Sequence, residues 1–310
     1  MVVIGIIALL ISIALPAFQG ARDQVRATTT HATIRVLETG LESFRADTQL
    51  GGNYPPSIHL DASSNYVMSP HTNLPINVYG ANLLVWALAG ADLLGSPGFR
   101  DLNSTDPVGG NYQGLAPWAD DTGKGSLYYI DGASDPRPGQ PHYPRIGPFV
   151  DVSKTKFAKQ TSPGVFEIPA DRNKTPISSL CILDAWDQPI LYYRANPSRS
   201  ALVSEYGHNT ATGIYALDDN VLFTGSVGQS QAGMDFGAGT THPIATLGTW
   251  LPATPTVPPT PVGSFAHHLY NPNIKAVHRP HNADSYILLS PGKDGRFGTA
   301  DDVANFEVNK

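Results

Sequence analysis

The first 18 residues, Met1 to Phe18, contain no charged side chain and are mostly aliphatic. As a helix they would span about 27 Å, close to the roughly 30 Å hydrocarbon core of a bilayer. A cleaved signal peptide needs a basic segment before a shorter apolar run, and a buried core helix is rarely apolar all round at an extreme N-terminus. The segment therefore predicts a retained membrane helix, in which Gly5 and Pro16 are tolerated.

A helical pattern continues beyond this segment, although the polarity changes abruptly. Residues 20–50 contain no proline, and Ile34, Leu37, Leu41 and Phe44 recur at spacings of three and four. This spacing predicts an amphipathic helix with one apolar stripe, ended by a Gly-Gly pair. We expect one continuous helix of about 50 residues, with its second half packed on a globular domain.

The composition limits what the rest of the chain can be. Thirty glycines, 27 prolines and only 15% charged residues favour a loop-rich domain that contains β-strands. The single cysteine, Cys181, excludes an intrachain disulfide and lies in an apolar run that predicts burial. Lys and Arg do not cluster, which argues against nucleic-acid binding.

Local patterns predict the elements of this domain. Residues 80–94 are dense in apolar side chains and predict a buried helix that a Gly-Ser-Pro-Gly run ends. Residues 179–183 and 189–194 flank a stretch of turn composition and predict a hairpin. Further short strands are expected at 126–130, 146–150, 164–168 and 212–217, with loop over 100–146 and an extended proline-rich segment at 251–262.

The C-terminal region combines an apolar strand with a glycine-rich, acidic loop. Calcium takes six to eight oxygen ligands from a loop that can curl around the ion. Here Asp294, Asp301 and Asp302 supply carboxylates, and backbone carbonyls near Leu289 and Ser290 can complete the shell. Three glycines permit tight curling, at Gly292, Gly295 and Gly298. The spacing is not that of an EF-hand, and a plain turn is the alternative.

Other polar groups carry weaker signals. Five histidines lie near one another in sequence, but their spacing matches no common zinc pattern, so packing roles are favoured for His242, His267, His268, His278 and His281. Asp218, Asp219 and Asn220 favour a solvated turn over a second acidic site. Nucleophile elbows, P-loops, Rossmann fingerprints and His-Glu-x-x-His motifs are absent, so we do not expect an enzyme.

Together these features resemble type IV pilins and the pseudopilins of type II secretion systems. The resemblance rests on the apolar start with its proline, the small and charged run that follows, a Tyr-Pro element after the helix, the second helix, an Asp-x-Trp turn and the acidic C-terminal loop. The residues that show these features are, in the same order, Met1–Phe18 with Pro16, Gly20–Asp23, Gly52–Pro55, 80–94, Asp184–Pro189 and 286–303. Asp187 stands in the turn where the family has a glycine.

The resemblance implies an α+β fold: a long N-terminal helix, membrane-spanning in its first half, packed on an antiparallel β-sheet with a large loop-rich insertion. The expected domains are a membrane and assembly helix at 1–19, its amphipathic continuation at 20–50, and a globular pilin-like domain at 51–310 with an acidic loop at 289–303. The implied site residues are Gly5, Pro16 and Phe18 for assembly, Asp184, Trp186 and Pro189 for the turn, and Leu289, Ser290, Asp294, Asp301 and Asp302 for calcium.

The implied function is that of a filament subunit. It would sit in the bacterial inner membrane as a single-pass protein, with its globular domain in the periplasm or on an extracellular filament. Its partners would be copies of itself, other pilin-like subunits and an inner-membrane assembly platform. Two alternatives stay open on sequence alone: an anchored extracellular adhesion module that does not polymerise, and an anchored hydrolase.

One departure from the family concerns the start of the chain. The glycine of the cleavage site, the phenylalanine and the glutamate that begin mature family members are missing before Met1. The nearest positive residues, Arg22, Arg26 and Arg35, follow the apolar segment, which alone would place the globular part in the cytoplasm. We therefore expect Met1 to be an internal methionine, with a basic leader encoded upstream.

Overall fold

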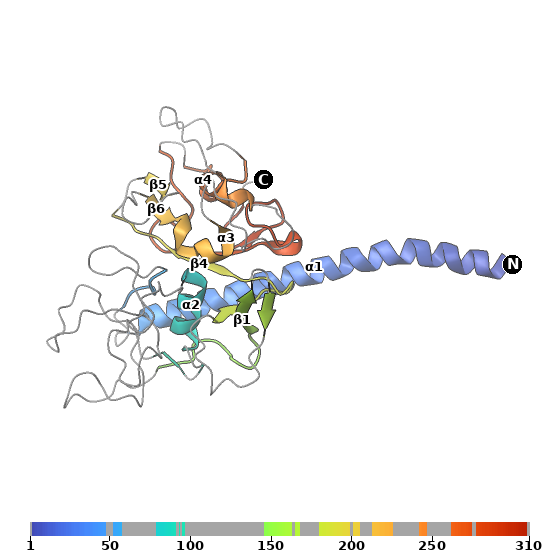
Figure 1. The fold of residues 1–310 in the computed structure, drawn as a ribbon, viewed down its shortest axis with the longest axis horizontal. Helices are drawn as coiled ribbons and strands as arrows, with labels where there is room; N and C mark the ends of the chain where they lie inside the picture. Colours follow the sequence, from blue (N-terminus) through green and yellow to red (C-terminus); the bar gives the residue numbers. More distant parts are fainter. Residues whose placement is uncertain are drawn as a thin grey trace.

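The computed structural model has an α+β architecture with one helix far longer than the rest (Figure 1). The residues that it describes are 2–47, 52–57, 79–90, 93, 95–96, 146–162, 165–167, 180–198, 201–204, 213–225, 242–246, 262–274 and 277–308. The predicted strand at 126–130, residues 100–145 of the predicted loop and residues 251–261 of the proline-rich segment lie outside the described residues.

Helix α1 runs without interruption from Val2 to Ala46, with Pro16 inside it. Its C-terminal part packs on the body, and its N-terminal part projects away from it (Figure 1). The predicted apolar stripe is confirmed, because Ile34, Leu37, Leu41 and Phe44 are all buried. Within the described residues, no helix combines the length and the apolarity that crossing a membrane requires.

Helix α2, Gly80–Leu88, is the second predicted helix, and every residue in it is buried. The predicted end at residue 94 is wrong. Gly90 takes a left-handed conformation with φ 88°, and its N–H bonds to the carbonyl of Val85. The chain therefore turns immediately after Ala89, as helices commonly do at a glycine.

The strands within the described residues form three small sheets instead of the one antiparallel sheet that was predicted. In the first, β1 (Phe157–Ser162) lies between β2 (Val165–Glu167) and β3 (Leu180–Ile182). In the second, β7 (Tyr286–Ser290) lies between β4 (Leu191–Arg194) and β8 (Val303–Ala304). Both are antiparallel, whereas β5 (Ala201–Ser204) and β6 (Gly213–Ala216) form a parallel pair.

Two strand predictions need correction. The segments 179–183 and 189–194 do meet through a bridge between Leu183 and Pro189, but β3 then pairs with β1 and β4 with β7. The predicted strand at 146–150 is reduced to one bridge, from Ile146 to Ser96. Strand β1 was not predicted. The strands predicted at 164–168 and 212–217 are present as β2 and β6.

Short helices complete the described structure. They are the 3-10 helices η3 (Leu217–Asn220), η4 (Pro243–Ala245) and η5 (Gly292–Asp294), and the α-helices α3 (Val221–Thr224) and α4 (Phe265–Leu269). The 218–220 turn is not solvated as predicted, because Asp219 and Asn220 are buried. Asn220 accepts from the N–H of Ala81 and donates to the carbonyl of Tyr192, which fixes the start of α2 on β4.

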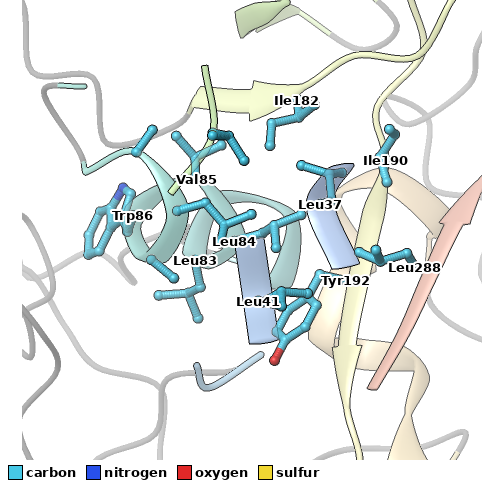
Figure 2. Packing of buried hydrophobic residues seen from close by; sticks show 14 of the residues in the cluster. Leu37, Leu41, Leu83, Leu84, Val85, Trp86, Ile182, Ile190, Tyr192 and Leu288 are labelled. Atoms are coloured by element: carbon cyan, nitrogen blue, oxygen red, sulfur yellow. The ribbon is translucent and has the colours of Figure 1, made fainter. Parts of the chain in front are cut away.

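The core lies on both faces of the β4–β7 pair. Alternate side chains of a strand point to opposite faces. Tyr192 and Leu288 pack with α1 and α2 on one face, where Figure 2 shows them beside Leu37 and Leu41. The side chains that alternate with these along each strand, such as Ile287 next to Leu288, pack on the other face with α4. Strand β7 is therefore buried on both sides and rigidly places the loop that follows it.

Candidate metal loop at the base of the projecting helix

The acidic loop leaves the end of β7, forms η5 and returns as β8. Its three glycines have φ values of 65°, 69° and 93°, at Gly292, Gly295 and Gly298. A side chain at Gly292 would collide with the carbonyl oxygen of Asp301, so this turn requires glycine. The predicted curling of the loop is confirmed.

The loop brings its three carboxylates to one hydroxyl group. The Oγ1 of Thr299 lies 2.7 Å from Oδ1 of Asp301 and 3.1 Å from Oδ1 of Asp302, and it also bonds to the side chain of Asp294. A hydroxyl carries a single proton, so it cannot satisfy three carboxylates at once. The arrangement concentrates negative charge that a cation would neutralise.

The carboxylates differ in how far the protein itself satisfies them. Asp294 accepts from the N–H of Arg296, and Asp301 accepts from the N–H of Asp294. The pKa of Asp294 is raised, first by burial and then by the charges of Asp301 and Asp302. Both Asp294 and Asp301 remain exposed. They are the two side chains of the set that solvent or an ion can reach most easily.

Asp302 is buried and more fully engaged. Its Oδ2 accepts from the N–H of Gly298 at 2.8 Å and lies 3.1 Å from Nε2 of His268. Only Oδ1, near Thr299, faces the other carboxylates. Asp302 therefore fits a role that closes the loop and contributes a single oxygen to an ion.

The oxygen atoms of the loop are of the kind that calcium prefers, but they are not already arranged as a complete coordination shell. It offers carboxylate oxygens, a hydroxyl and the backbone carbonyls at the end of β7, all hard oxygen ligands. Across the part of the chain that the structure describes, no group of three or more His, Cys, Asp or Glu side chains is already arranged to hold a metal ion. Asp294 and Asp301 would have to rotate toward a bound ion.

The predicted turn is joined directly to this loop. Oδ1 of Asp184 accepts from the N–H groups of Trp186 and Gln188, and its Oδ2 accepts from the hydroxyl of Ser290 at 2.6 Å. Ser290 also accepts from the N–H of Gly292, the first residue of η5. Asp184 thus fixes the turn and the entry to the acidic loop together, and the Ser290 hydroxyl is already used.

Asp187 lies at the most strained position of the turn. Asp187 adopts the left-handed conformation with φ 63°, which aspartate tolerates better than most residues. Its carboxylate accepts from Nζ of Lys156 at 2.8 Å. Pro189 is buried in the bridge that closes the turn, and Trp186 is half-buried against the α1–α2 core cluster.

The loop and the turn both hold α1 where it leaves the body. Nζ of Lys293 lies 2.6 Å from a carboxylate oxygen of Asp23. Two turns further along, Thr30 is fully buried and its hydroxyl accepts from the N–H of Ala185 at 3.2 Å. The two contacts form a collar around α1, which we define as Asp23–Lys293 and Thr30–Ala185. The predicted assembly residues Gly5, Pro16 and Phe18 lie on α1 beyond this collar.

The histidines play packing roles, as favoured from their spacing. His281 stacks on Phe306 with ring centroids 4.7 Å apart, and Nδ1 of His242 accepts from the N–H of Phe297. The pairing of His268 with Asp302 was not predicted. The two residues are 34 positions apart, and no local spacing signals their contact.

A groove of about 980 Å³ runs beside the collar. Asp23, Ala27 and His31 of α1 line one side, and residues between Ala300 and Val308 line the other. Searches of family models, curated proteins and solved structures found none that matches this chain.

Proposed function

We propose that this chain is a pilin-like filament subunit, anchored in a membrane and assembled through the apolar first part of α1. The observation that carries the proposal is the division of one 45-residue helix between a packed part and a projecting part. The packed part buries its apolar stripe, whereas Phe18 on the projecting part is 70% exposed. An exposed apolar helix in water needs lipid or other subunits to cover it.

The cellular setting follows from the same proposal. The uncharged segment Met1–Phe18 inserts in the bacterial inner membrane as a single pass, and the body lies in the periplasm or on the surface of a filament. Copies of this chain, other pilin-like subunits and an inner-membrane assembly platform are the proposed partners. Gly5, Pro16 and Phe18 belong to the assembling helix, where proline allows local adjustment of the helix during packing.

We further propose that the acidic loop binds calcium. Asp294 and Asp301 are the direct side-chain ligands, Asp302 adds Oδ1, and the carbonyls of Leu289 and Ser290 complete the shell. The convergence of three carboxylates on the Thr299 hydroxyl supports this assignment. Bound calcium would stiffen the loop that holds Asp23, and so would strengthen the collar.

Electron microscopy of cells that express the full-length gene tests the filament proposal. We expect filaments that contain this chain, and their loss when Phe18 and Leu15 are both changed to Ser. The matched control changes Thr28 and Thr29 to Ser, also on the exposed part of α1. A chain that stays monomeric and membrane-bound, whether it carries the Leu15 and Phe18 substitutions or those at Thr28 and Thr29, would favour a non-polymerising adhesion module.

Thermal unfolding with and without a chelator tests the calcium proposal. For the full chain in detergent, calcium at 100 times its Kd stabilises the fold by about 2.7 kcal/mol. Asp301→Asn should remove this difference, while Asp187→Asn, outside the loop, should keep it. Because ligands must be deprotonated, the calcium effect should weaken as the pH falls, and earlier than for ordinary carboxylates, since the pKa of Asp294 is raised. An unchanged melting temperature after chelation would leave the loop as a plain turn.

A further inference from the structure

The stretch of α1 from Leu15 to His31, which spans the collar, presents two different faces. Asp23, Ala27 and His31 line the groove on one face. Phe18 and Val25, which are 70% and 64% exposed, lie on another. At about 100° per residue, the two sets point to roughly opposite sides of the helix. Each molecule therefore carries a hollow and an apolar ridge on opposite sides of the same element.

The charges on the two faces are complementary. The exposed carboxylates of Asp301 and Glu307 line the groove, and Lys293 on its wall is already bonded to Asp23. On the opposite face, the exposed side chain of Arg22 lies between Phe18 and Val25. A basic group flanked by two apolar ones therefore faces outward on one side, and an acidic groove with apolar walls opens on the other.

We infer that the groove receives the ridge of a second copy of this chain, formed by Leu15, Phe18, Arg22 and Val25. The inference rests on the proposed filament function and names the contact through which neighbouring subunits meet. A patch and its complement on opposite sides of one molecule make a heterologous contact, which repeats without closing. The same contact covers the exposed apolar side chains and pairs Arg22 with the exposed carboxylate of Glu307 in the groove.

The positions of the two faces also set how neighbouring copies are displaced. The middle of the ridge lies about seven residues closer to the N-terminus than the middle of the groove segment on α1. At 1.5 Å per residue, parallel neighbours are shifted by about 10 Å along the helix axis. The projecting part of one copy then lies beside the collar of the next.

Cysteine cross-linking on the full chain tests this contact. Val25→Cys on the ridge and Ala300→Cys on the groove wall are combined in one chain and oxidised in filament-bearing cells. The native Cys181 is fully buried, and burial raises its thiol pKa, so it gives no background. The two new cysteines lie on opposite sides of α1, so each cross-link joins two molecules, and we expect a ladder of products longer than dimers.

The matched control replaces Val25→Cys by Thr28→Cys, an exposed position off both faces. It should give at least severalfold less product, because its thiol does not enter the groove. The inference would be overturned if the control gave an equally strong ladder of products, or if the products stopped at dimers. If filaments form but the Val25–Ala300 pair gives no product, the groove contact is wrong and the filament function stands. If no filaments form, both fall together.

Charge reversal gives an independent readout. Arg22→Glu should lower the cross-linking yield by about two- to fivefold, the range expected for one exposed ion pair. Glu307→Arg should do the same, and the double variant should restore the yield. Glu307 is chosen because it lies in the groove and outside the proposed calcium ligands. Additive losses in the double variant would contradict the proposed pairing.

Discussion

The two parts of α1 belong to one continuous helix but have opposite surroundings. After Thr30, the apolar stripe is covered by α2 and the β4–β7 pair, and Leu37 and Leu41 are fully buried. Before Asp23, the described large apolar side chains, Leu15 and Phe18, are more than half exposed. The collar marks the change. The backbone is helical on both sides of the collar, but the side chains change from an uncharged apolar segment to an amphipathic one, and only the second is covered by the body.

This difference teaches that helicity and burial have separate causes in this chain. The projecting part needs a partner outside the molecule, and the packed part needs the body. Changes on the two sides of the collar should therefore separate into effects on stability and effects on assembly.

The largest expected effect comes from the packed part. Leu41→Ala should lower the free energy of unfolding by about 2–5 kcal/mol, because it leaves a cavity between α1, α2 and β4. Val36→Ala, on the exposed side of the same part, should stay within about 0.5 kcal/mol of the native chain. Urea unfolding followed by tryptophan fluorescence measures both. Equal losses of unfolding free energy in the two variants would show that packing against the body does not decide which side of the helix contributes to stability.

The next effect concerns the segment that follows the packed part. The hydroxyl of Ser57 donates to Asp219, and burial raises the pKa of Asp219 to about 7. The folded chain then binds more protons than the unfolded chain between pH 4 and 7, so stability falls as the pH rises through this window. From pH 5 to 8 the loss should be about 2–3 kcal/mol.

Asp219→Asn should remove most of this pH dependence, because the amide does not ionise. Its neighbour Asp218, which is only half-buried, provides the control, since Asp218→Asn should keep most of the slope. Urea unfolding at several pH values measures both variants. A slope that survives in Asp219→Asn would assign the pH dependence to another group.

A smaller effect is expected at the Asp184 turn, which adjoins the collar. Asp184→Ala removes the acceptor of two N–H groups and of the Ser290 hydroxyl, which should cost about 1–3 kcal/mol. Hydrogen exchange should also rise at Ala185, which donates to Thr30. Asp284→Ala, at an exposed site, serves as the control. If hydrogen exchange at Ala185 does not change, then the Asp184 turn does not support the contact between Ala185 and Thr30.

The smallest effect on stability should come from Lys293→Ala. Its ion pair with Asp23 is exposed on the lysine side, so the melting temperature should not change. The collar should nevertheless loosen, which broadens the distance between spin labels at Thr28 on α1 and Asn273 on the body. Lys154→Ala, which breaks a surface pair with Asp151, should leave this distance distribution narrow.

Much of the candidate site follows from local sequence. The spacing of Ile34, Leu37, Leu41 and Phe44 defines the packed face of α1, and the glycines of the acidic loop define its curl. Asp184 and its turn were likewise predictable, because aspartate accepts from N–H groups two and four residues further on. These features depend on periodicity or turn chemistry, which a short stretch of chain determines by itself.

Only the tertiary structure decided which elements meet. The strands expected to pair with each other in a hairpin belong to different sheets, because β3 pairs with β1 and β4 pairs with β7. The pairing of His268 with Asp302 and the contact of Lys293 with Asp23 join distant positions. The sequence alone determined that α1 is helical and has an apolar stripe. Where the body stops covering that helix was decided by long-range packing, because burial depends on neighbours that no local pattern specifies.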